Sequence, residues 1–264
     1  MENKWNFIRW KDITVAVSNL GNVDLSEFDD LYQLPIVAGD TLSFYGNFDT
    51  ISSLDKSDWG VSLFDCNMNA VSSDIGLSID TVSGSFTNFY SQFTVPSLPR
   101  YDKYYLIVHD QYLQTAYYIS NPLRNISTSE ALKTYQIEYN NSSNRDNFFY
   151  ENVPGFSNKF RIHLNISKPV DKENAEGYQL IDGTFKVARS TSGRTKEFIT
   201  LWFDEFAHNA FFSMTKHDNI IIDNTSWLRN ENDEYTVEWT DNYQFSEGVI
   251  RLDDTAYAIS NKMC

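Results

Sequence analysis

Hydrophobic and polar residues alternate along most of the chain with the two-residue period of half-buried β-strands. The alternating segments are rich in β-branched and aromatic residues, and Gly, Pro, Asn and Asp separate them as turn formers do. They lie at 41–48, 59–66, 86–95, 103–110, 134–140, 159–166, 183–189, 196–203, 219–223, 235–239 and 248–254. Eleven or more such strands predict an all-β protein built of sandwiches or a barrel. We expect two antiparallel β-sandwich domains, of jelly-roll or immunoglobulin-like type.

The segment KYYLIVHDQYLQTAYYIS at 103–120 predicts a hairpin of two strands. In its first strand, Tyr105, Ile107 and His109 share one face, and the alternate residues from Tyr104 share the other. Both faces are largely apolar, which is typical of a central strand or an interface strand. The pattern gives no role for His109.

Helical signals are few. The segment DEFAHNAFFSM at 204–214 predicts one short helix that packs on a sheet, with Asp204 as its N-cap and Glu205 in its first turn. One or two helical turns are expected at 26–34, with Ser26 as the cap, because Pro35 follows. The flexible, cationic segment STSGRT at 190–195 is expected to form a hairpin tip.

The polar stretch SNPLRNISTSEALK at 120–133 contains Pro122 and no clear strand pattern, so it predicts a domain boundary. We therefore expect an N-terminal β-sandwich domain over 1–121. A C-terminal β-rich domain over 122–264 would carry the short helix near 204–214.

Composition narrows the class of protein. The chain has 264 residues, of which 41% are hydrophobic and 16% aromatic, enough to form a large core. Its net charge of −15 makes nucleic acid an unexpected partner, because binding needs a cationic face. No apolar run is long enough for a membrane-spanning helix, and no signal peptide is recognisable. Only Cys66 and Cys264 are present, so we expect a reducing cytoplasm as the place of synthesis.

No catalytic, cofactor-binding or metal-binding residue is predicted. The four histidines, His109, His163, His208 and His217, have no spacing that suits zinc. Asp65, Asn67 and Asn69 match part of a calcium loop, but Ala70 and Gly76 stand where that loop needs Gly and Glu, so a hairpin turn is the better interpretation. Adjacent acidic pairs such as Asp204–Glu205 do not by themselves form a glycosidase pair.

Tryptophans are the remaining candidates for contact with a partner or ligand. Trp5, Trp10 and Trp59 are the predicted interface or ligand residues, Trp5 and Trp10 because they lie close together near the N-terminus. Trp202 and Trp239 fall within alternating strands and are expected in the core.

From about Tyr104 onward the chain resembles virion structural proteins of tailed bacteriophages of Bacteroidota, including the crAss-like phages. The matching segments are KYYLIVHD, YYISNPLRN, TYQIEYNNSSNRDNFFYE, NKFRIHLNI and FITLWFDEFAHNAFFSMTKHDNIIIDNTSWLR. The chain departs from these proteins in lacking a Gly-rich turn before the helix. The resemblance implies a tail, connector or baseplate component built from β-sandwiches, and it implies no catalytic residues.

Three hypotheses follow. The first is a non-enzymatic structural subunit at the tail, neck or baseplate of a phage particle, assembled in the host bacterial cytoplasm as a homo-oligomeric ring with other virion proteins. The second is a carbohydrate- or receptor-binding module at the tail tip that binds a glycan through its first domain. The third is a glycoside hydrolase with a site assembled from distant carboxylates.

Overall fold

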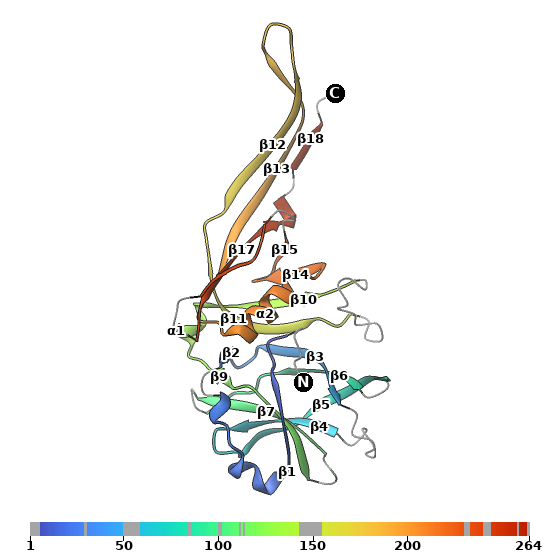
Figure 1. The fold of residues 1–264 in the computed structure, drawn as a ribbon, viewed down its shortest axis with the longest axis vertical. Coiled ribbons are helices and arrows are strands. Elements are labelled where there is room, and N and C mark those ends of the chain that lie inside the picture. The colour runs from blue at the N-terminus through green and yellow to red at the C-terminus, as the bar shows by residue number, and fades with distance from the viewer. Residues whose placement is uncertain are drawn as a thin grey trace.

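The computed structural model describes residues 6–28, 31–49, 59–83, 86–99, 102–110, 112, 114–142, 155–229, 233–239, 244–257 and 259–262. These residues form eighteen strands and a few short helices, so the predicted all-β fold is confirmed. The body of the molecule consists of two stacked groups of strands, and a long β-hairpin extends from it (Figure 1).

The first group of strands forms one continuous antiparallel sheet in the order β1, β8, β7, β4, β5, β6, β3. β5 is long enough to pair with β4 through its first half and with β6 through its second half, which carries the sheet round a corner. The bounds of these strands are Trp10–Ala16 (β1), Thr41–Asp49 (β3), Trp59–Asp65 (β4), Ala70–Ser83 (β5), Phe86–Thr94 (β6), Lys103–Asp110 (β7) and Thr115–Ser120 (β8).

The tyrosine-rich hairpin at 103–120 is confirmed, because β7 pairs with β8 on one side and with β4 on the other. Its two faces enter different hydrophobic clusters. Tyr104, Leu106 and Val108 lie in the main core, whereas Tyr105 and Ile107 lie in a smaller cluster under the 3₁₀ helix Val17–Asn22 (η1). A central strand buried on both faces explains why this segment is apolar on both.

The stretch at 120–133 is more ordered than its composition predicts. Leu123–Asn125 forms β9, which pairs in parallel with β2 (Leu34–Ile36) and antiparallel with β7, so the first group of strands continues past residue 121. The helix α1 (Thr128–Ala131) follows, and its N-cap Ser127 and Glu130 form a capping box. The Ser-x-x-Glu spacing is the signal in the sequence for this helix. Among the described residues of 26–34, Ser26–Phe28 forms a 3₁₀ turn (η2), and the N–H of Ser26 donates to Asp24 Oδ1.

The second group closes into a ring of six antiparallel strands, in the order β10, β11, β13, β17, β15, β14 and back to β10. Alternate residues of these strands point inward and fill the ring, for example Ile137, Phe160, Ile220 and Ile250. The bounds are Thr134–Asn140 (β10), Asn158–Ile166 (β11), Phe185–Thr200 (β13), Asn219–Ile222 (β14), Thr225–Arg229 (β15) and Glu247–Asp254 (β17).

The predicted helix at 204–214 is confirmed as α2 (Glu205–Met214), with Asp204 as its N-cap. Its apolar residues pack into the same core as the ring, through Ala207, Ala210, Phe211 and Met214. One core cluster therefore runs through both groups of strands, from Trp10 in the first to Trp227 in the second.

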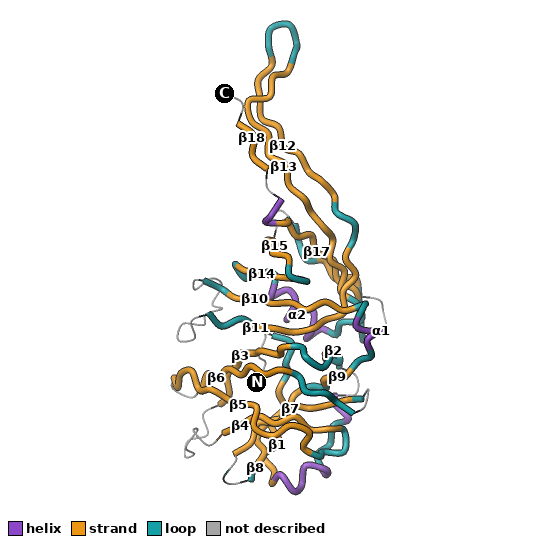
Figure 2. The backbone as a smooth tube through the Cα atoms, turned by 180° about the vertical axis from the view of Figure 1, so that it is seen from behind, coloured by secondary structure: helices purple, strands orange, loops and turns teal. Residues whose placement is uncertain are grey.

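The long hairpin is made by β12 (Val170–Gln179) and the outer part of β13, and we call residues 170–195 the arm (Figure 2). The segment 190–195 does not form the expected tip. It lies inside β13, paired with β12 on one side and with β18 (Ile259–Lys262) on the other. Thr favours strands, and pairing with neighbouring strands takes up the backbone groups of this segment, which outweighs the flexibility of Gly193. The turn lies at 180–184 instead, where Gly183 has a φ of 86°.

Candidate functional site

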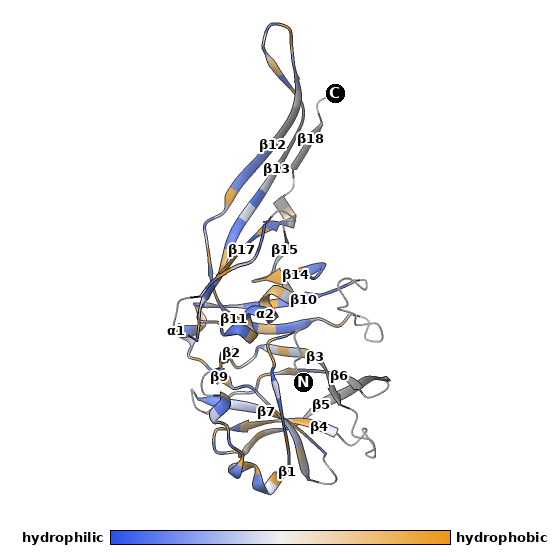
Figure 3. Ribbon diagram, viewed as in Figure 1, coloured by the Kyte–Doolittle hydropathy of each residue, from blue (hydrophilic) through white to orange (hydrophobic). Residues whose placement is uncertain are grey.

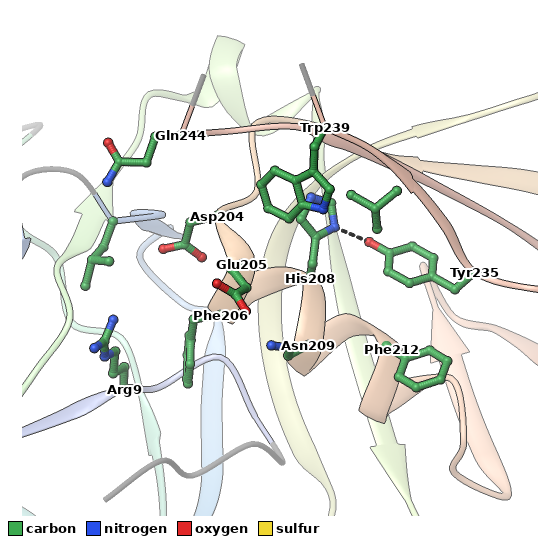
Figure 4. Close-up of a pocket in the computed structure, with 12 residues that line it drawn as sticks. Arg9, Asp204, Glu205, Phe206, His208, Asn209, Phe212, Tyr235, Trp239 and Gln244 are labelled. Carbon is green, nitrogen blue, oxygen red and sulfur yellow. Dashed lines mark hydrogen bonds between the residues drawn. The ribbon is translucent and has the colours of Figure 1, made fainter. Parts of the chain in front are cut away.

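A pocket of about 840 Å³ opens at the base of the arm, beside α2 (Figure 4). Its walls come from distant parts of the sequence. They are Arg9 just before β1, Leu31 before β2, the helix α2 with Asp204, and residues of the short strand β16 (Thr236–Glu238) and its neighbours up to Gln244. A concave site between two structural units with mixed polar and apolar walls is typical of a binding site.

The helix α2 presents one side to this pocket. Glu205, Asn209 and Phe212 lie three or four residues apart, which places them on one face of the helix, and all three line the pocket. The side chain of Asp204 serves the fold instead. Its Oδ1 accepts the N–H of Ala207 at 2.7 Å, and its Oδ2 accepts the N–H of Tyr32 at 3.0 Å.

His208 forms the inner wall of the pocket and is held by two hydroxyl groups. Its Nε2 lies 2.8 Å from Ser246 Oγ, and its Nδ1 makes a short hydrogen bond with the hydroxyl of Tyr235. Burial lowers the pKa of His208 to about 4, so the ring is neutral near pH 7. Burial also raises the pKa of Tyr235 well above its usual value. The neutral His208 ring is held between the hydroxyl groups of Tyr235 and Ser246, and these contacts fix the position of the wall.

Tyr235 is also close to the backbone of β17. Thr200 Oγ1 lies 3.5 Å from the Tyr235 hydroxyl and accepts the N–H of Gly248 at 2.7 Å. A Cβ atom added at Gly248 would lie 2.2 Å from that hydroxyl, so only glycine leaves room for it. The shape of the inner wall thus depends on β13, β17 and α2 together.

Two of the predicted contact tryptophans are not on the surface. Trp10 is buried against Phe44 and Phe89, and Trp59 is buried with its ring stacked on Tyr117 at 5.3 Å. In this conformation the sheet to which they belong covers both rings, and their role in an interface or ligand contact stays a prediction. Trp5 lies outside the described residues.

The exposed tryptophans are the two that were expected in the core. Trp202 has a φ of 55°, which breaks the alternation after β13, so Phe203 takes the buried position and Trp202 is 66% exposed. Trp239 follows the three-residue strand β16 and is 50% exposed at the rim of the pocket, where its ring meets the His208 ring at 5.3 Å. Figure 4 shows the Trp239 indole beside His208.

The tip of the arm, residues 178–185, carries three large apolar side chains that are exposed. Figure 3 shows hydrophobic residues among hydrophilic ones at this end of the hairpin. Tyr178 is 57% exposed, Phe185 is 54% exposed and Ile181, in the turn, is fully exposed. Register pairs Tyr178 with Lys186 and Gln179 with Phe185, so Tyr178 and Phe185 lie on opposite faces of the hairpin. Sequence reasoning missed this site because it expected the tip at 190–195.

The arm carries four basic and four acidic residues, with the acidic ones at 171–182, whereas the described segments around the pocket are acidic. From Gly183 to Lys196 the chain carries Lys186, Arg189, Arg194 and Lys196 and no acidic residue. The segments 204–212, 233–239 and 244–247 around the pocket carry six acidic residues and no Lys or Arg: Asp204, Glu205, Asp233, Glu234, Glu238 and Glu247. Arg9 is the cation that lines the pocket.

The candidate calcium loop is a hairpin turn, as predicted, because β4 and β5 flank it. Asp65 Oδ1 accepts the backbone N–H groups of Asn67 and Asn69, which uses the carboxylate to hold the turn. Burial and the neighbouring Asp102 raise the pKa of the Cys66 thiol, which disfavours a nucleophilic thiolate.

Of the other histidines, His163 also contacts a tyrosine hydroxyl, that of Tyr32. Tyr32 Oη accepts the backbone N–H of His163 at 3.0 Å and lies 3.1 Å from its Nδ1, and burial lowers the pKa of His163 to about 4. His109 Nε2 lies 2.8 Å from Ser62 Oγ. Within the described part of the chain, no group of three or more His, Cys, Asp and Glu residues is arranged to hold a metal ion.

Comparison of the chain with protein-family models and with curated proteins found no match. None of the helices among the described residues is both long enough and apolar enough to cross a membrane. The site therefore has to be interpreted from its own geometry.

Proposed function

We propose that the protein is a non-enzymatic structural subunit of a tailed-bacteriophage particle, at the tail, neck or baseplate, that assembles with further copies and other virion proteins. The observation that carries the proposal is the arm. It projects from the body as a hairpin that ends in exposed Tyr178, Ile181 and Phe185 (Figure 1). Large exposed apolar side chains at the end of an extended element are a feature of association surfaces.

The arrangement of charge supports assembly over isolated function. A chain with a net charge of −15 repels its own copies unless basic groups meet acidic ones. The arm offers such a basic group in the exposed Lys186, directly behind its tip. The resemblance of the segments from Tyr104 onward to virion structural proteins supports a function in a phage particle.

The test is to raise antibodies against the purified chain and apply them to purified particles of tailed phages that infect Bacteroidota, with electron microscopy as the readout. Gold label at one position of the tail or neck is the expected result. Label confined to host lysate, with clean particles from the same preparation, contradicts the proposal.

A second candidate function is saccharide binding, which is favoured by one observation. The half-exposed indole of Trp239 lines the same pocket as Glu205, Asn209 and Gln244, and an aromatic platform with planar polar groups suits a sugar ring. This places the candidate glycan site in the second half of the chain instead of the first. Asp204 is used by backbone N–H groups, so a glycosidase pair with Glu205 is not proposed.

A further inference from the structure

The tip of the arm and the pocket both expose apolar side chains, and they do not contact each other within one chain. We propose that the tip of one copy occupies the pocket of a second copy, in a head-to-tail contact. This inference rests on the proposed function and adds the identity of the surface and its partner. Three observations carry it: distance, shape and charge.

Distance excludes a contact within one copy. The pocket begins at Asp204, directly after β13, whereas the tip lies at the other end of that sixteen-residue strand. At about 3.3 Å per residue, the strand separates the two by about 50 Å. Figures 1 and 2, from opposite sides, both show the arm extending away from the body, so a pocket that receives the tip belongs to another molecule.

Shape favours a concave partner over a flat one. Phe185 lies on the face of Gly177, where an added Cβ would meet the Phe185 ring at 2.8 Å, and Tyr178 lies on the other face. Ile181 is at the turn between them. A flat surface covers one face of such a tip, whereas a pocket lined by residues such as Phe206, Val237 and Trp239 contacts both.

Charge favours this pocket as the acceptor. Lys186, directly behind the tip, and Glu205, at the pocket, are exposed residues of opposite charge. Asp182 in the turn of the tip and Arg9 in the pocket wall form a second exposed pair of opposite charge. When a tip enters a pocket, Lys186 approaches the rim on which Glu205 is exposed. Opposite charges at the rim of an interface guide association and set its orientation.

The contact joins different surfaces of the two copies, so it is heterologous. In an open series, one end copy has a free tip and the other has a free pocket until the series closes on itself. The expected assembly is therefore a ring or a filament and not a dimer with two-fold symmetry.

The test uses the full chain, with sedimentation velocity over a range of concentrations. Ile181→Asp changes the tip and Trp239→Ala changes the pocket, and each is expected to weaken self-association by about 30-fold or more, as loss of a central anchor does. Val170→Ser at the base of the arm and Trp202→Ala are the matched controls, because both residues are exposed apolar positions away from the tip and the pocket, and they are expected to associate like the wild type.

Exchanging the charges of Lys186 and Glu205 distinguishes the loss of a direct contact from misfolding of the variants. Lys186→Glu and Glu205→Lys alter exposed side chains, so both variants are expected to fold, and each is expected to weaken association. The double variant, which restores opposite charges at the contact, is expected to recover association. Thermal unfolding of each variant verifies the fold.

Mixing the two single variants tests the head-to-tail geometry. An Ile181→Asp chain still has an intact pocket, and a Trp239→Ala chain still has an intact tip. The mixture is therefore expected to form heterodimers that grow no further, while each variant alone stays monomeric. Association of the mixture into long assemblies contradicts the geometry.

The outcomes distinguish the inference from the proposed function. If tip variants lose association and pocket variants keep it, the tip docks elsewhere and the inference fails while an assembly role stands. If the wild type is monomeric at every concentration, the inference fails, and particle labelling decides the proposed function separately. If N-acetylglucosamine, galactose or mannose oligosaccharides quench Trp239 fluorescence without displacing a second copy, the pocket is a glycan site and the inference is wrong.

Discussion

Asp40 and Arg161 form a bidentate ion pair that joins the two groups of strands. Arg161 Nε donates to Asp40 Oδ2 at 2.6 Å and Nη2 donates to Oδ1 at 2.8 Å, while Gln136 Nε2 donates to the same Oδ1 at 2.6 Å. Asp40 directly precedes β3 in the first group, and Arg161 lies on β11 of the ring. Both side chains are largely buried, so water does not replace a lost partner well.

Removal of one partner from this pair is expected to be strongly destabilising. Arg161→Ala leaves the Asp40 carboxylate without its guanidinium in a largely buried site, and a loss of about 3 kcal/mol in the free energy of unfolding is expected. Urea unfolding measures it. The matched control is Arg251→Ala, since the Arg251–Glu197 pair is exposed and is expected to contribute about 0.5 kcal/mol. Equal losses for the two variants would show that Arg161 is not a joint between the halves.

His208 gives the fold a dependence on pH. Its pKa is about 4 in the folded chain and about 6.5 in an exposed histidine, so the unfolded chain binds its proton first as pH falls. Stability is therefore expected to decrease as pH drops from about 6.5 to about 4. The His208→Gln variant keeps an amide between the two hydroxyl groups but does not titrate, so its urea midpoint is expected to decrease less over this range. His163, whose pKa is also about 4, accounts for part of the remaining slope.

The buried side chain of Asn121 hydrogen-bonds three backbone groups, and its removal is expected to destabilise the segment at 7–9. Its Oδ1 accepts the N–H of Arg9 at 3.0 Å, and its Nδ2 donates to the carbonyls of Phe7 and Tyr32 at 3.2 and 3.4 Å. Asn121→Ala leaves these groups without their partner, at an expected cost of about 2 kcal/mol. Hydrogen exchange at Arg9 is expected to increase. Asn219→Ala, at an exposed position with one side-chain partner, is the control and is expected to change little.

Asp204 is expected to act as a helix cap and as a tie to the segment before β2. Asp204→Ala removes the acceptor of the Ala207 N–H and of the Tyr32 N–H, so a loss of about 2 kcal/mol is expected. Asp204→Asn keeps one acceptor oxygen and is expected to cost about half as much. Circular dichroism and thermal unfolding measure both. If Asp204→Ala has the helix content and melting temperature of the wild type, α2 does not depend on its cap.

The sequence predicted most of the long strands that enter a core, and it missed β1, the short strands β2 and β9, and the exposed strand β12. Segments such as 134–140 and 159–166 alternate strictly because one face of each is buried inside the ring, and the structure matches their bounds within a residue. The strand β12 has the sequence VDKENAEGYQ and was not predicted. Where their side chains are described, its residues are exposed, so no buried face imposes a period on the sequence.

The candidate site was predicted only in part, for the same reason. The cap and first turn of α2 follow local rules, so Asp204 and the bounds of the helix were predictable. The exposure of a tryptophan is not local. Trp59 is covered by Tyr117 from another strand, whereas Trp239 follows a short strand at the rim of the pocket, and nothing in the flanking residues distinguishes these cases.

The sequence by itself determined that this is an all-β protein with one helix of ten residues at 205–214, because period-two patterning and capping act between near neighbours. Only the tertiary structure decided that six strands close into a ring, that residues 170–195 form an arm, and that Arg9, α2 and Trp239 meet in one pocket. Those features depend on pairing between segments far apart in the chain, such as β10 with β14, and a single sequence carries no local signal for such pairing.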